Sequence, residues 1–287
     1  MTLKEALDQA REGKRALGHF NISDIAAFRA IVRAAGELKV PILIGTSEGE
    51  AEFVDMDVAA AMVKDAREET GQDIFLNADH FRDLDKAKMA AKAGYDSIIY
   101  DGAKLSHEEN TVKTKEAAIA IREINPNILV EGEIGYIGES SKLLDALPEG
   151  AQIDEGALPT VEEVKRYVDE TGVDLIAPAV GNIHGKFKGA PNPDLKIDLI
   201  RGIRAATDVH IILHGGSGVS DEDFRAAIEA GVSAVHINTE IRIAWKKGME
   251  RALSDEEQIA PYKIFPEAEE AVYEVVLKRL KLFSGLV

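Results

Sequence analysis

Short apolar runs alternate with longer amphipathic segments along almost the whole chain. The short runs are continuous, as in parallel strands that are covered on both faces. The longer segments repeat apolar residues every three or four positions, as on one face of a helix. The predicted strands are Ala16–Phe20, Pro41–Thr46, Asp73–Asn77, Ser97–Tyr100, Ile128–Ile134, Leu175–Ala179, His210–Leu213 and Ala234–Ile237. The helices predicted to follow them are Ile22–Leu38, Asp57–Glu69, Leu84–Ala93, Glu108–Ile124, Val161–Glu170, Asp198–Ala206, Ser220–Ala230 and Thr239–Leu253.

Eight such strand–helix units predict an α/β fold, a (β/α)8 TIM barrel, with residues 1–287 as a single domain. A doubly wound open sheet would use the same units and is the structural alternative. Outside the repeat, residues 1–12 form an amphipathic segment and Pro266–Phe283 predicts a terminal helix on the barrel exterior. The polar insertion Glu139–Leu158 is expected to be a mobile loop at the active site.

Composition narrows the possible chemistry. The chain has no cysteine, so disulfides and thiolate ligands are excluded, and any metal must be held by His, Asp or Glu. With 51 acidic and 34 basic residues the formal net charge is −17, which predicts that the protein binds neither nucleic acid nor an anionic membrane. No apolar stretch is long enough to span a membrane, and the amino-terminal segment lacks the apolar region of a signal peptide. We therefore expect a cytoplasmic protein.

Polar residues and glycines gather where the predicted strands end. In a TIM barrel, the carboxyl-terminal ends of the strands form the active site. The strand ends that carry such residues are Asn77–His80, Glu131–Glu133, Gly181–Lys186, His214–Gly218 and His236–Thr239. We interpret this rim as the candidate functional site.

Three histidines of this rim, His80, His184 and His214, are candidate metal ligands. A catalytic Zn²⁺ commonly takes three protein ligands and leaves one position open for substrate. Glu133 is a candidate further ligand, whereas Glu131 is expected to point to the opposite side of its strand. The alternative is that each imidazole only hydrogen-bonds the backbone of a loop.

Asp79 directly precedes His80 and is the candidate acid–base group of the rim. A carboxylate there could exchange a proton with a substrate hydroxyl. Its alternative role is to cap a loop or to orient an imidazole. Of the remaining histidines, His107 and His210 are expected at the surface.

A glycine-rich segment, His214-Gly-Gly-Ser-Gly218, precedes the helix predicted to begin at Ser220. Glycines let backbone N–H groups approach an anion, and a helix amino terminus favours negative charge. Together with Asn238 and Thr239 at the next strand end, the segment predicts a phosphate site of the kind that barrels build after strands seven and eight. Lysines near the rim would assist, and Lys188 is the candidate. A tight loop without a ligand is the alternative.

Taken together, these segments resemble the class II, metal-dependent fructose-bisphosphate and tagatose-bisphosphate aldolases over nearly the whole chain. The segments that carry the resemblance are Gly18-His-Phe-Asn21, Thr46-Ser-Glu-Gly49, Asp79-His80, Asp101-Gly102, Glu108-Glu-Asn110, Glu131-Gly-Glu-Ile-Gly135, Gly181-Asn-Ile-His-Gly185, Leu213-His-Gly-Gly-Ser-Gly218 and Asn238-Thr-Glu240. The resemblance implies a zinc-dependent lyase of glycolysis and carbohydrate metabolism that acts on a sugar phosphate. It also implies a homo-oligomer, a dimer or a tetramer.

The resemblance implies a role for most residues of the rim. The three candidate histidines match the zinc ligands, and Asp79 matches the residue that exchanges a proton with the C4 oxygen of the substrate. Asn21 and Ser47 would line the mouth. The residues that match the phosphate site for dihydroxyacetone phosphate are Gly185, Gly215, Ser217, Asn238 and Thr239. A monovalent cation, Na⁺ or K⁺, would bind near the first two of these.

The mechanism that this implies uses a Lewis acid. Zn²⁺ would polarise the substrate ketone and stabilise the enediolate that forms when the carbon–carbon bond breaks. The competing imine mechanism needs a lysine inside the barrel, and no predicted strand contains one.

The chain departs from the family pattern at several positions. His236 stands where the family has an asparagine, and Ala234 where it commonly has a lysine. Strand three ends in Asn77-Ala-Asp-His80 in place of His-x-Asp-His. The loop reads Gly138-Glu-Ser-Ser141 in place of two glycines and an acidic pair. Glu139 is the nearest candidate acid for proton transfer, and Asp145 and Glu149 lie further along the loop. His236 is a candidate hydrogen-bond donor or acid in place of the asparagine.

Three hypotheses follow. The first is a zinc aldolase of the class II type that reversibly cleaves a ketose phosphate, such as fructose 1,6-bisphosphate, to dihydroxyacetone phosphate and an aldehyde. The second is a metal-dependent barrel enzyme that catalyses isomerisation or another cleavage on a different sugar phosphate. The third is a non-catalytic sugar-phosphate binder. Release of triose phosphate separates the first from isomerisation, and ligand-induced thermal stabilisation without turnover indicates the third.

Overall fold

Eight parallel strands close into a barrel in the computed structural model, which describes residues 1–138, 142–146, 158–188 and 192–286. The order around the barrel is β1-β10-β9-β7-β5-β4-β3-β2, and β1 pairs with both β2 and β10. The predicted TIM barrel is therefore confirmed, and the alternative prediction of a doubly wound open sheet is wrong. The barrel strands are β1 Leu17–Asn21, β2 Ile42–Ser47, β3 Ile74–Phe81, β4 Ser97–Tyr100, β5 Leu129–Ile134, β7 Leu175–Pro178, β9 His210–Leu213 and β10 Val232–Ile237.

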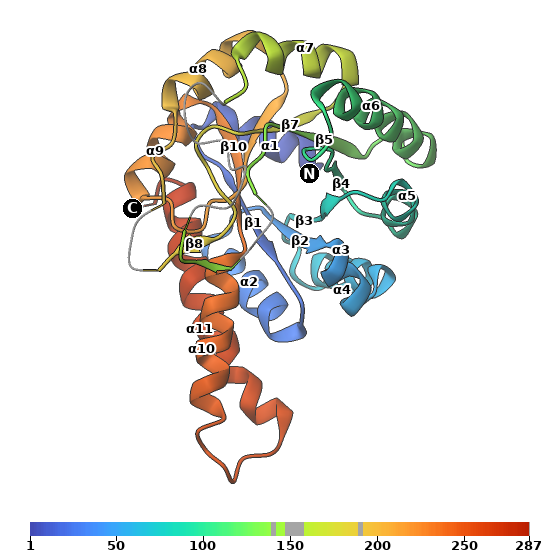
Figure 1. Cartoon of the computed structure of the whole chain (residues 1–287). Helices are drawn as coiled ribbons and strands as arrows, with labels where there is room; N and C mark the ends of the chain where they lie inside the picture. The colour runs from blue at the N-terminus through green and yellow to red at the C-terminus, as the bar shows by residue number, and fades with distance from the viewer. Residues whose placement is uncertain (139–141, 147–157, 189–191, 287) are drawn as a thin grey trace.

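Helices alternate with the strands and surround the barrel (Figure 1). Except for α1, their apolar faces pack on the outer face of the sheet in one large hydrophobic cluster. The helices are α1 Leu3–Glu12, α2 Ile25–Leu38, α3 Glu48–Val54, α4 Met56–Thr70, α5 Leu84–Ala93, α6 His107–Ile124, α7 Val161–Thr171, α8 Ile197–Ala206, α9 Asp221–Ala230, α10 Thr239–Ala252 and α11 Pro261–Phe283.

Helix α1 packs against the apolar amino-terminal end of the barrel interior. Its apolar residues, and one inward-facing residue from each of several strands, form a separate cluster: Leu3, Ala6, Leu7, Ala10, Leu17, Leu43, Phe75, Leu129, Leu175, Ile212 and Ala234. Two residues further along the strands, the inward positions become polar, as with buried His19, Asn77, Glu131 and His236. The barrel is thus apolar at one end and polar at the other, which places the chemistry at the carboxyl-terminal ends of the strands.

Several boundaries differ from the sequence prediction. Strand β3 continues to Phe81, four residues beyond its predicted end at Asn77. The short helix α3 was not predicted, although Ser47 and Glu50 form a capping box at its start. Helix α11 begins at Pro261 rather than Pro266, and Pro266 lies inside it.

The predicted loop insertion contains a short strand. Strand β6 (Leu143–Leu144) pairs with β8 (Lys186–Phe187) in a two-stranded sheet outside the barrel. Residues 139–141 and 147–157 of the insertion lie outside the described part of the chain. The mobility expected for this loop therefore stays a prediction.

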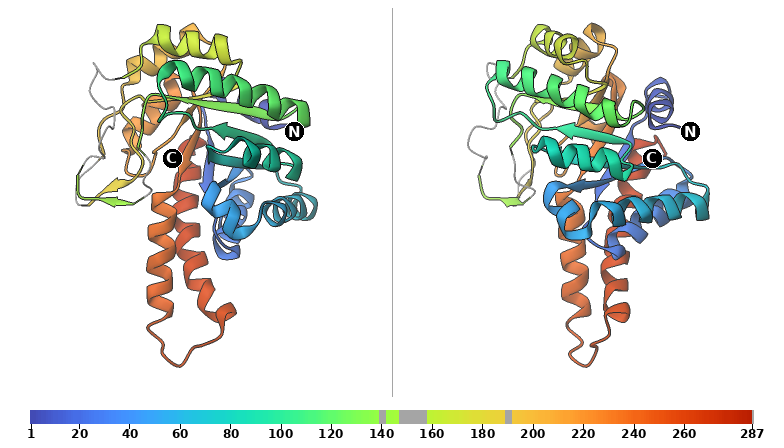
Figure 2. Two further views of the ribbon diagram at one scale, coloured as in Figure 1. Left: turned by 45° about the vertical axis from the view of Figure 1, so that its right-hand side comes forward. Right: turned by 90° about the vertical axis from the view of Figure 1, so that its right-hand side faces the viewer.

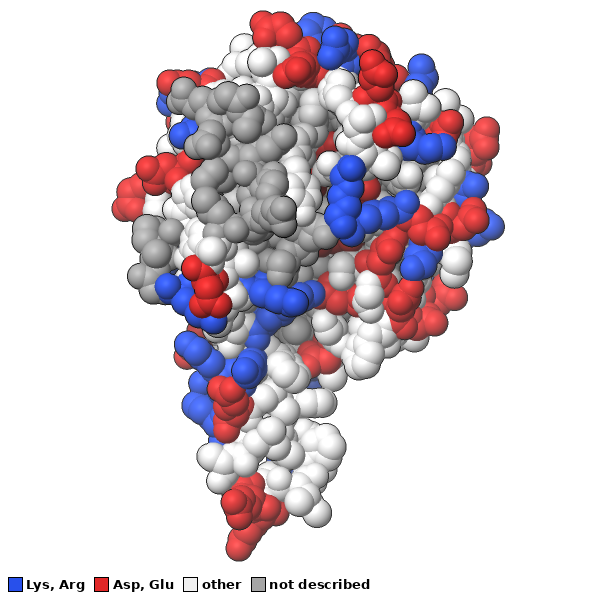
Figure 3. All heavy atoms as spheres, in the orientation of Figure 1, with Lys and Arg blue, Asp and Glu red and all other residues white. Residues whose placement is uncertain are grey.

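Helices α10 and α11 lie side by side and project from the barrel as an arm (Figure 2). Near its tip, Ile259 is 85% exposed and Tyr262 is 76% exposed, so apolar surface gathers there. On the face seen in Figure 3, acidic and basic side chains are interspersed over the barrel helices. Among the described residues, every helix is too short or too polar to cross a lipid bilayer.

Candidate functional site

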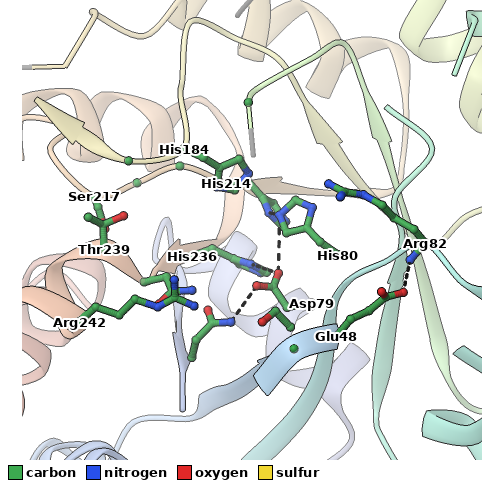
Figure 4. Close-up of a pocket in the computed structure, with 18 residues that line it drawn as sticks. Glu48, Asp79, His80, Arg82, His184, His214, Ser217, His236, Thr239 and Arg242 are labelled. Carbon is green, nitrogen blue, oxygen red and sulfur yellow. Dashed lines mark hydrogen bonds and ion pairs between the residues drawn. The ribbon is translucent and has the colours of Figure 1, made fainter. Parts of the chain in front are cut away.

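A cavity of about 230 Å³ opens at the carboxyl-terminal ends of the barrel strands (Figure 4). Because these ends meet at one rim, residues that are far apart in the sequence come together there. The predicted site residues that line the cavity are Asn21, Ser47, Asp79, His80, His184, Gly185, His214, Gly215, Ser217, His236, Asn238 and Thr239.

A bulge in β3 turns two neighbouring side chains toward the cavity. Consecutive residues of a strand normally face opposite sides of the sheet. The register between β3 and β4 shifts between Ala78 and Phe81, and His80 has a φ angle of 54°. A positive φ is uncommon for a residue with a side chain and strains the backbone. Because of this bulge, both Asp79 and His80 line the cavity.

Four side chains form a group that can hold a metal ion. His80, Glu133, His184 and His214 each offer one ligand atom, and these atoms lie within 4.8 Å of one another. The atoms His80 Nε2 and His214 Nδ1 are 2.9 Å apart, and the ring centroids of His80 and His184 are 4.7 Å apart. The Nε2 atom of His184 is buried without a hydrogen-bond partner. A buried nitrogen without a partner, beside two other imidazoles, fits a metal ligand better than a structural histidine.

Burial and the neighbouring carboxylates together determine the pKa values of these histidines. Burial lowers the pKa of His214 to about 3, and together with the charge of His80 it holds the pKa of His184 well below its usual value. Burial also disfavours a charge on His80, but the surrounding carboxylates, Asp79 foremost, raise its pKa to about 10. Because a metal binds neutral imidazoles, a cation at this site would displace the proton of His80.

Two glutamates of β5 face the site together. Glu131 Oε1 and His214 Nε2 form a hydrogen bond of 2.8 Å, and Glu133 Oε2 lies 3.4 Å from His80 Nδ1. The expectation that Glu131 points away was wrong, because residues two apart in a strand share a face. Burial raises the pKa of Glu131 to about 8 and holds that of Glu133 well above its usual value. Glu131 orients the His214 ring so that Nδ1 faces His80.

Asp79 is held by Asn21 and faces two histidines. Its Oδ2 atom accepts a hydrogen bond of 2.9 Å from Asn21 Nδ2. Its Oδ1 atom lies 3.3 Å from His236 Nδ1 and 3.8 Å from His80 Nε2. Burial by itself would raise the pKa of Asp79, but the charge of His80 and the contact with His236 hold it well below its usual value. Asp79 is therefore a carboxylate that can accept a proton.

Except for Lys188, the predicted phosphate residues line the cavity, and Figure 4 shows two of them, Ser217 and Thr239, on one side of it. Thr239 is the first residue of α10, and Ser217 Oγ accepts a hydrogen bond of 3.1 Å from the backbone of Glu240. The amide of Asn192 ties two loops together by donating to the carbonyl oxygens of Gly185 and Ser217. The amino terminus of α10 and the nearby backbone N–H groups favour an anion here.

The family model described as class-II fructose-bisphosphate aldolase matches residues 1–285. The chain belongs to this family. A fructose-bisphosphate aldolase of Geobacillus stearothermophilus is 31% identical to this aldolase, over 99% of the chain and 97% of that relative. A 6-phospho-5-dehydro-2-deoxy-D-gluconate aldolase of Shouchella clausii is 32% identical, over 97% of the chain and 92% of that relative.

Solved structures show the same fold as this aldolase. A putative fructose-1,6-biphosphate aldolase from Coccidioides immitis matches with a TM-score of 0.84 and 26% identity, over 99% of this chain and 98% of that chain. The YdjI aldolase from Escherichia coli K12 matches with a TM-score of 0.81 and 24% identity, over 99% and 97% of the two chains. Of the three hypotheses, the first is confirmed in its enzyme class, because the chain is a lyase of the class II aldolase type.

Three predicted site residues are not among those that line the described cavity of the aldolase. Glu133 contacts the site through His80, with its Oε2 atom 3.4 Å from His80 Nδ1. Glu139 lies outside the described residues. Lys188 is about half exposed and pairs with Asp145 at 2.9 Å, away from the residues that line the cavity. The surface position expected for His210 was wrong: this residue is 4% exposed and lies 3.1 Å from Ser233 Oγ. It begins β9, at the end of the barrel that α1 covers.

Sequence reasoning missed several charged residues at the aldolase cavity, among them Glu48 at the start of α3. Arg82, between β3 and α5, and Arg242, in the first turn of α10, line the cavity, and Glu50 lies beside it. Two spacings were available as signals. Arg242 follows Asn238 by four residues and therefore shares its helix face. Glu50 follows Ser47 by three residues, which is the spacing of a capping box.

Gly215 of the aldolase leaves no space for a side chain. Its φ angle is 62°, and an added Cβ would lie 2.4 Å from the carbonyl oxygen of Ile183. We expect Gly215→Ala to displace the loop before Ser217, to raise KM and to lower the free energy of unfolding by about 1–3 kcal/mol. Chemical denaturation measures the free energy of unfolding. Gly49→Ala is the stability control, because a Cβ there meets no atom within 4 Å. A Gly215→Ala variant as stable as the parent would contradict the expectation.

Proposed function

We propose that the protein is a zinc-dependent aldolase that reversibly cleaves a ketose phosphate, such as fructose 1,6-bisphosphate, to dihydroxyacetone phosphate and an aldehyde. One observation supports the proposal: three imidazoles, the Asp79 carboxylate and the residues of the predicted phosphate site line a single cavity. His80, His184 and His214, with Glu133 beside them, offer the nitrogen and oxygen donors that Zn²⁺ prefers. When bound there, Zn²⁺ supplies a Lewis acid that polarises the ketone of the substrate.

The substrates in the names of the two relatives have one part in common with the proposed substrate. Fructose bisphosphate and 6-phospho-5-dehydro-2-deoxy-D-gluconate both carry a phosphate on the carbon next to a ketone. We assign this phosphate to the cradle formed by Ser217, Asn238, Thr239 and the backbone of Gly185 and Gly215, with Na⁺ or K⁺ bound near the two glycines. The other half of the substrate would extend along the wall that contains Asn21 and Ser47.

The side chains of the protein supply the proton transfers. Asp79 accepts the proton of the C4 hydroxyl as this C–O group becomes the carbonyl of the aldehyde. The C3–C4 bond breaks, and its electron pair stays with the fragment of C1 to C3, delocalised onto the C2 oxygen. A proton delivered to C3 completes dihydroxyacetone phosphate, and Glu139 is the proposed donor. Burial holds the pKa of His236 well below its usual value, so this residue would donate a hydrogen bond rather than a proton.

An imine mechanism has no nucleophile in the barrel. All eight barrel strands are described, and none of them contains a lysine. The metal route accordingly accounts for the buried histidines and needs no such group.

Metal removal and a substrate panel test the proposal. Treatment with a chelator is expected to abolish cleavage, and added Zn²⁺ to restore it. Release of triose phosphate is measured with fructose 1,6-bisphosphate, tagatose 1,6-bisphosphate and 6-phospho-5-dehydro-2-deoxy-D-gluconate. A metal-free preparation with full activity would end the metal assignment. If all three compounds released no triose phosphate, the substrate assignment would be wrong.

The second candidate function is cleavage of 6-phospho-5-dehydro-2-deoxy-D-gluconate, because the relative with that name is 32% identical over 92% of its length. The same panel distinguishes the two by kcat/KM. We also propose a cytoplasmic location and a homo-oligomer, a dimer or a tetramer. The mass of the protein in solution, measured by light scattering, tests the proposed homo-oligomer.

A further inference from the structure

Glu50, in the first turn of α3, is a buried carboxylate beside the cavity. It is 6% exposed. Its Oε2 atom accepts hydrogen bonds from Asn21 Nδ2 and from both the backbone and the hydroxyl of Ser47. Its Oε1 atom accepts from Ser23 Oγ and Arg242 Nη2. All five partners donate, and an ionised carboxylate can accept from all of them, whereas a protonated acid cannot.

Asn21 connects Glu50 to Asp79. The Asn21 amide nitrogen carries two hydrogens, of which one is donated to Glu50 Oε2 at 2.8 Å and the other to Asp79 Oδ2 at 2.9 Å. All three side chains are buried. Without the Glu50 carboxylate, only the hydrogen bond to Asp79 Oδ2 would hold the amide nitrogen in place. The two carboxylates together therefore fix the orientation of the amide.

Arg242 and Ser47 clamp Glu50 from two different elements. Arg242 Nη2, on α10, donates to Oε1 at 2.6 Å, while the backbone of Ser47, at the end of β2, donates to Oε2 at 2.9 Å. Arg242 and Asp79, the two residues at the ends of this chain of contacts, both line the cavity and are labelled in Figure 4. Arg242 and the Ser47 backbone therefore fix Glu50, and Glu50 in turn fixes the amide that reaches Asp79.

We propose that Glu50 is a positioning residue for carbon–carbon bond cleavage: it fixes the Asn21 amide and so holds the Asp79 carboxylate toward the C4 hydroxyl. This inference rests on the proposed role of Asp79. Glu50 also belongs to the capping box of α3, and a purely structural role would affect every step of the reaction. A positioning role affects only the step that uses Asp79.

Glu50→Gln in the full-length, zinc-loaded enzyme tests the proposal. Glutamine can still cap the helix, but its amide nitrogen would face Asn21 or Arg242, which are both donors. Two reactions are compared: cleavage of the preferred substrate, and exchange of the C3 hydrogen of dihydroxyacetone phosphate with D₂O, which involves no C4 hydroxyl. We expect kcat for cleavage to fall about 10–100-fold because of the misplaced carboxylate. The exchange rate, KM and zinc content are expected to stay unchanged.

The matched control is Glu163→Gln in the capping box that Thr160 and Glu163 form at the start of α7, away from the cavity. This variant should cleave at the parental rate. The proposal is overturned if Glu50→Gln slows cleavage and exchange equally, or if it cleaves like the parent. Should Glu50→Gln fail to fold, Arg242→Met removes the guanidinium that holds Glu50 Oε1, at a half-exposed position. Because Arg242 also lines the cavity, cleavage and exchange are then compared at saturating substrate, and only kcat for cleavage is expected to fall.

Asp79→Asn in the same two assays separates this inference from the proposed function. If Asp79→Asn cleaves normally, the assigned role of Asp79 is wrong, and the positioning role falls with it. If Asp79→Asn is slow in cleavage only while Glu50→Gln is normal, the function stands and only the positioning role is wrong.

Discussion

His184→Ala is expected to abolish stoichiometric zinc binding and to lower kcat/KM for cleavage by about a thousandfold or more, which corresponds to about 4 kcal/mol. The Nε2 atom of His184 is buried and has no hydrogen-bond partner, so removing it leaves the remaining ligands incomplete. The loss of kcat/KM should exceed that caused by substituting any residue of the phosphate cradle, because both the polarisation of the ketone and the geometry of the site depend on the metal ion.

Metal content by elemental analysis and steady-state cleavage measure this effect. His107→Ala is the matched control, because His107 is exposed at the start of α6 and does not line the cavity. It should keep both zinc and activity. Full zinc occupancy in His184→Ala would show that the ligand assignment is wrong, whatever happens to the rate.

The barrel could be predicted because its signal is local and repeated. Continuous apolar runs bounded by amphipathic helices specify each unit, and the observed bounds of β4, β9 and α5 are those expected from the sequence. The end of β3 was missed because its pairing continues through polar residues across a bulge. Helix α3 has only seven residues, too few to give a clear periodic pattern, and depends on its cap and on packing.

The residues of the candidate site that lie at strand ends could be predicted from the sequence. Asp79 and the three histidines occur there beside small or polar residues, which signals a functional rim. The supporting network was missed, because its contacts join residues that are distant in sequence. Glu50 and Arg242, for example, are 192 positions apart, and neither shows a pattern that predicts the other. Barrel closure brings them together, and such pairs emerge only from the three-dimensional arrangement.

Asp79→Asn is expected to lower kcat for cleavage about 10²–10⁴-fold while the enzyme keeps its zinc. The substitution preserves the size of the side chain, and its amide oxygen can still accept from Asn21 Nδ2. The amide nitrogen can donate to His236 Nδ1, which is buried without a hydrogen-bond partner. The variant should therefore fold, and it lacks only the oxygen that takes up a proton.

Two measurements make this outcome specific. Exchange of the C3 hydrogen of dihydroxyacetone phosphate with D₂O should remain, because that half-reaction uses the metal ligands and the cradle but not the C4 hydroxyl. Cleavage should be lost even at saturating substrate, since Asp79 acts on the reacting oxygen rather than on binding. Equal losses of exchange and cleavage would assign Asp79 to the metal environment through His80, from which its Oδ1 atom is 3.8 Å away. Cleavage at the parental rate would remove Asp79 from the chemistry and require another base at the rim.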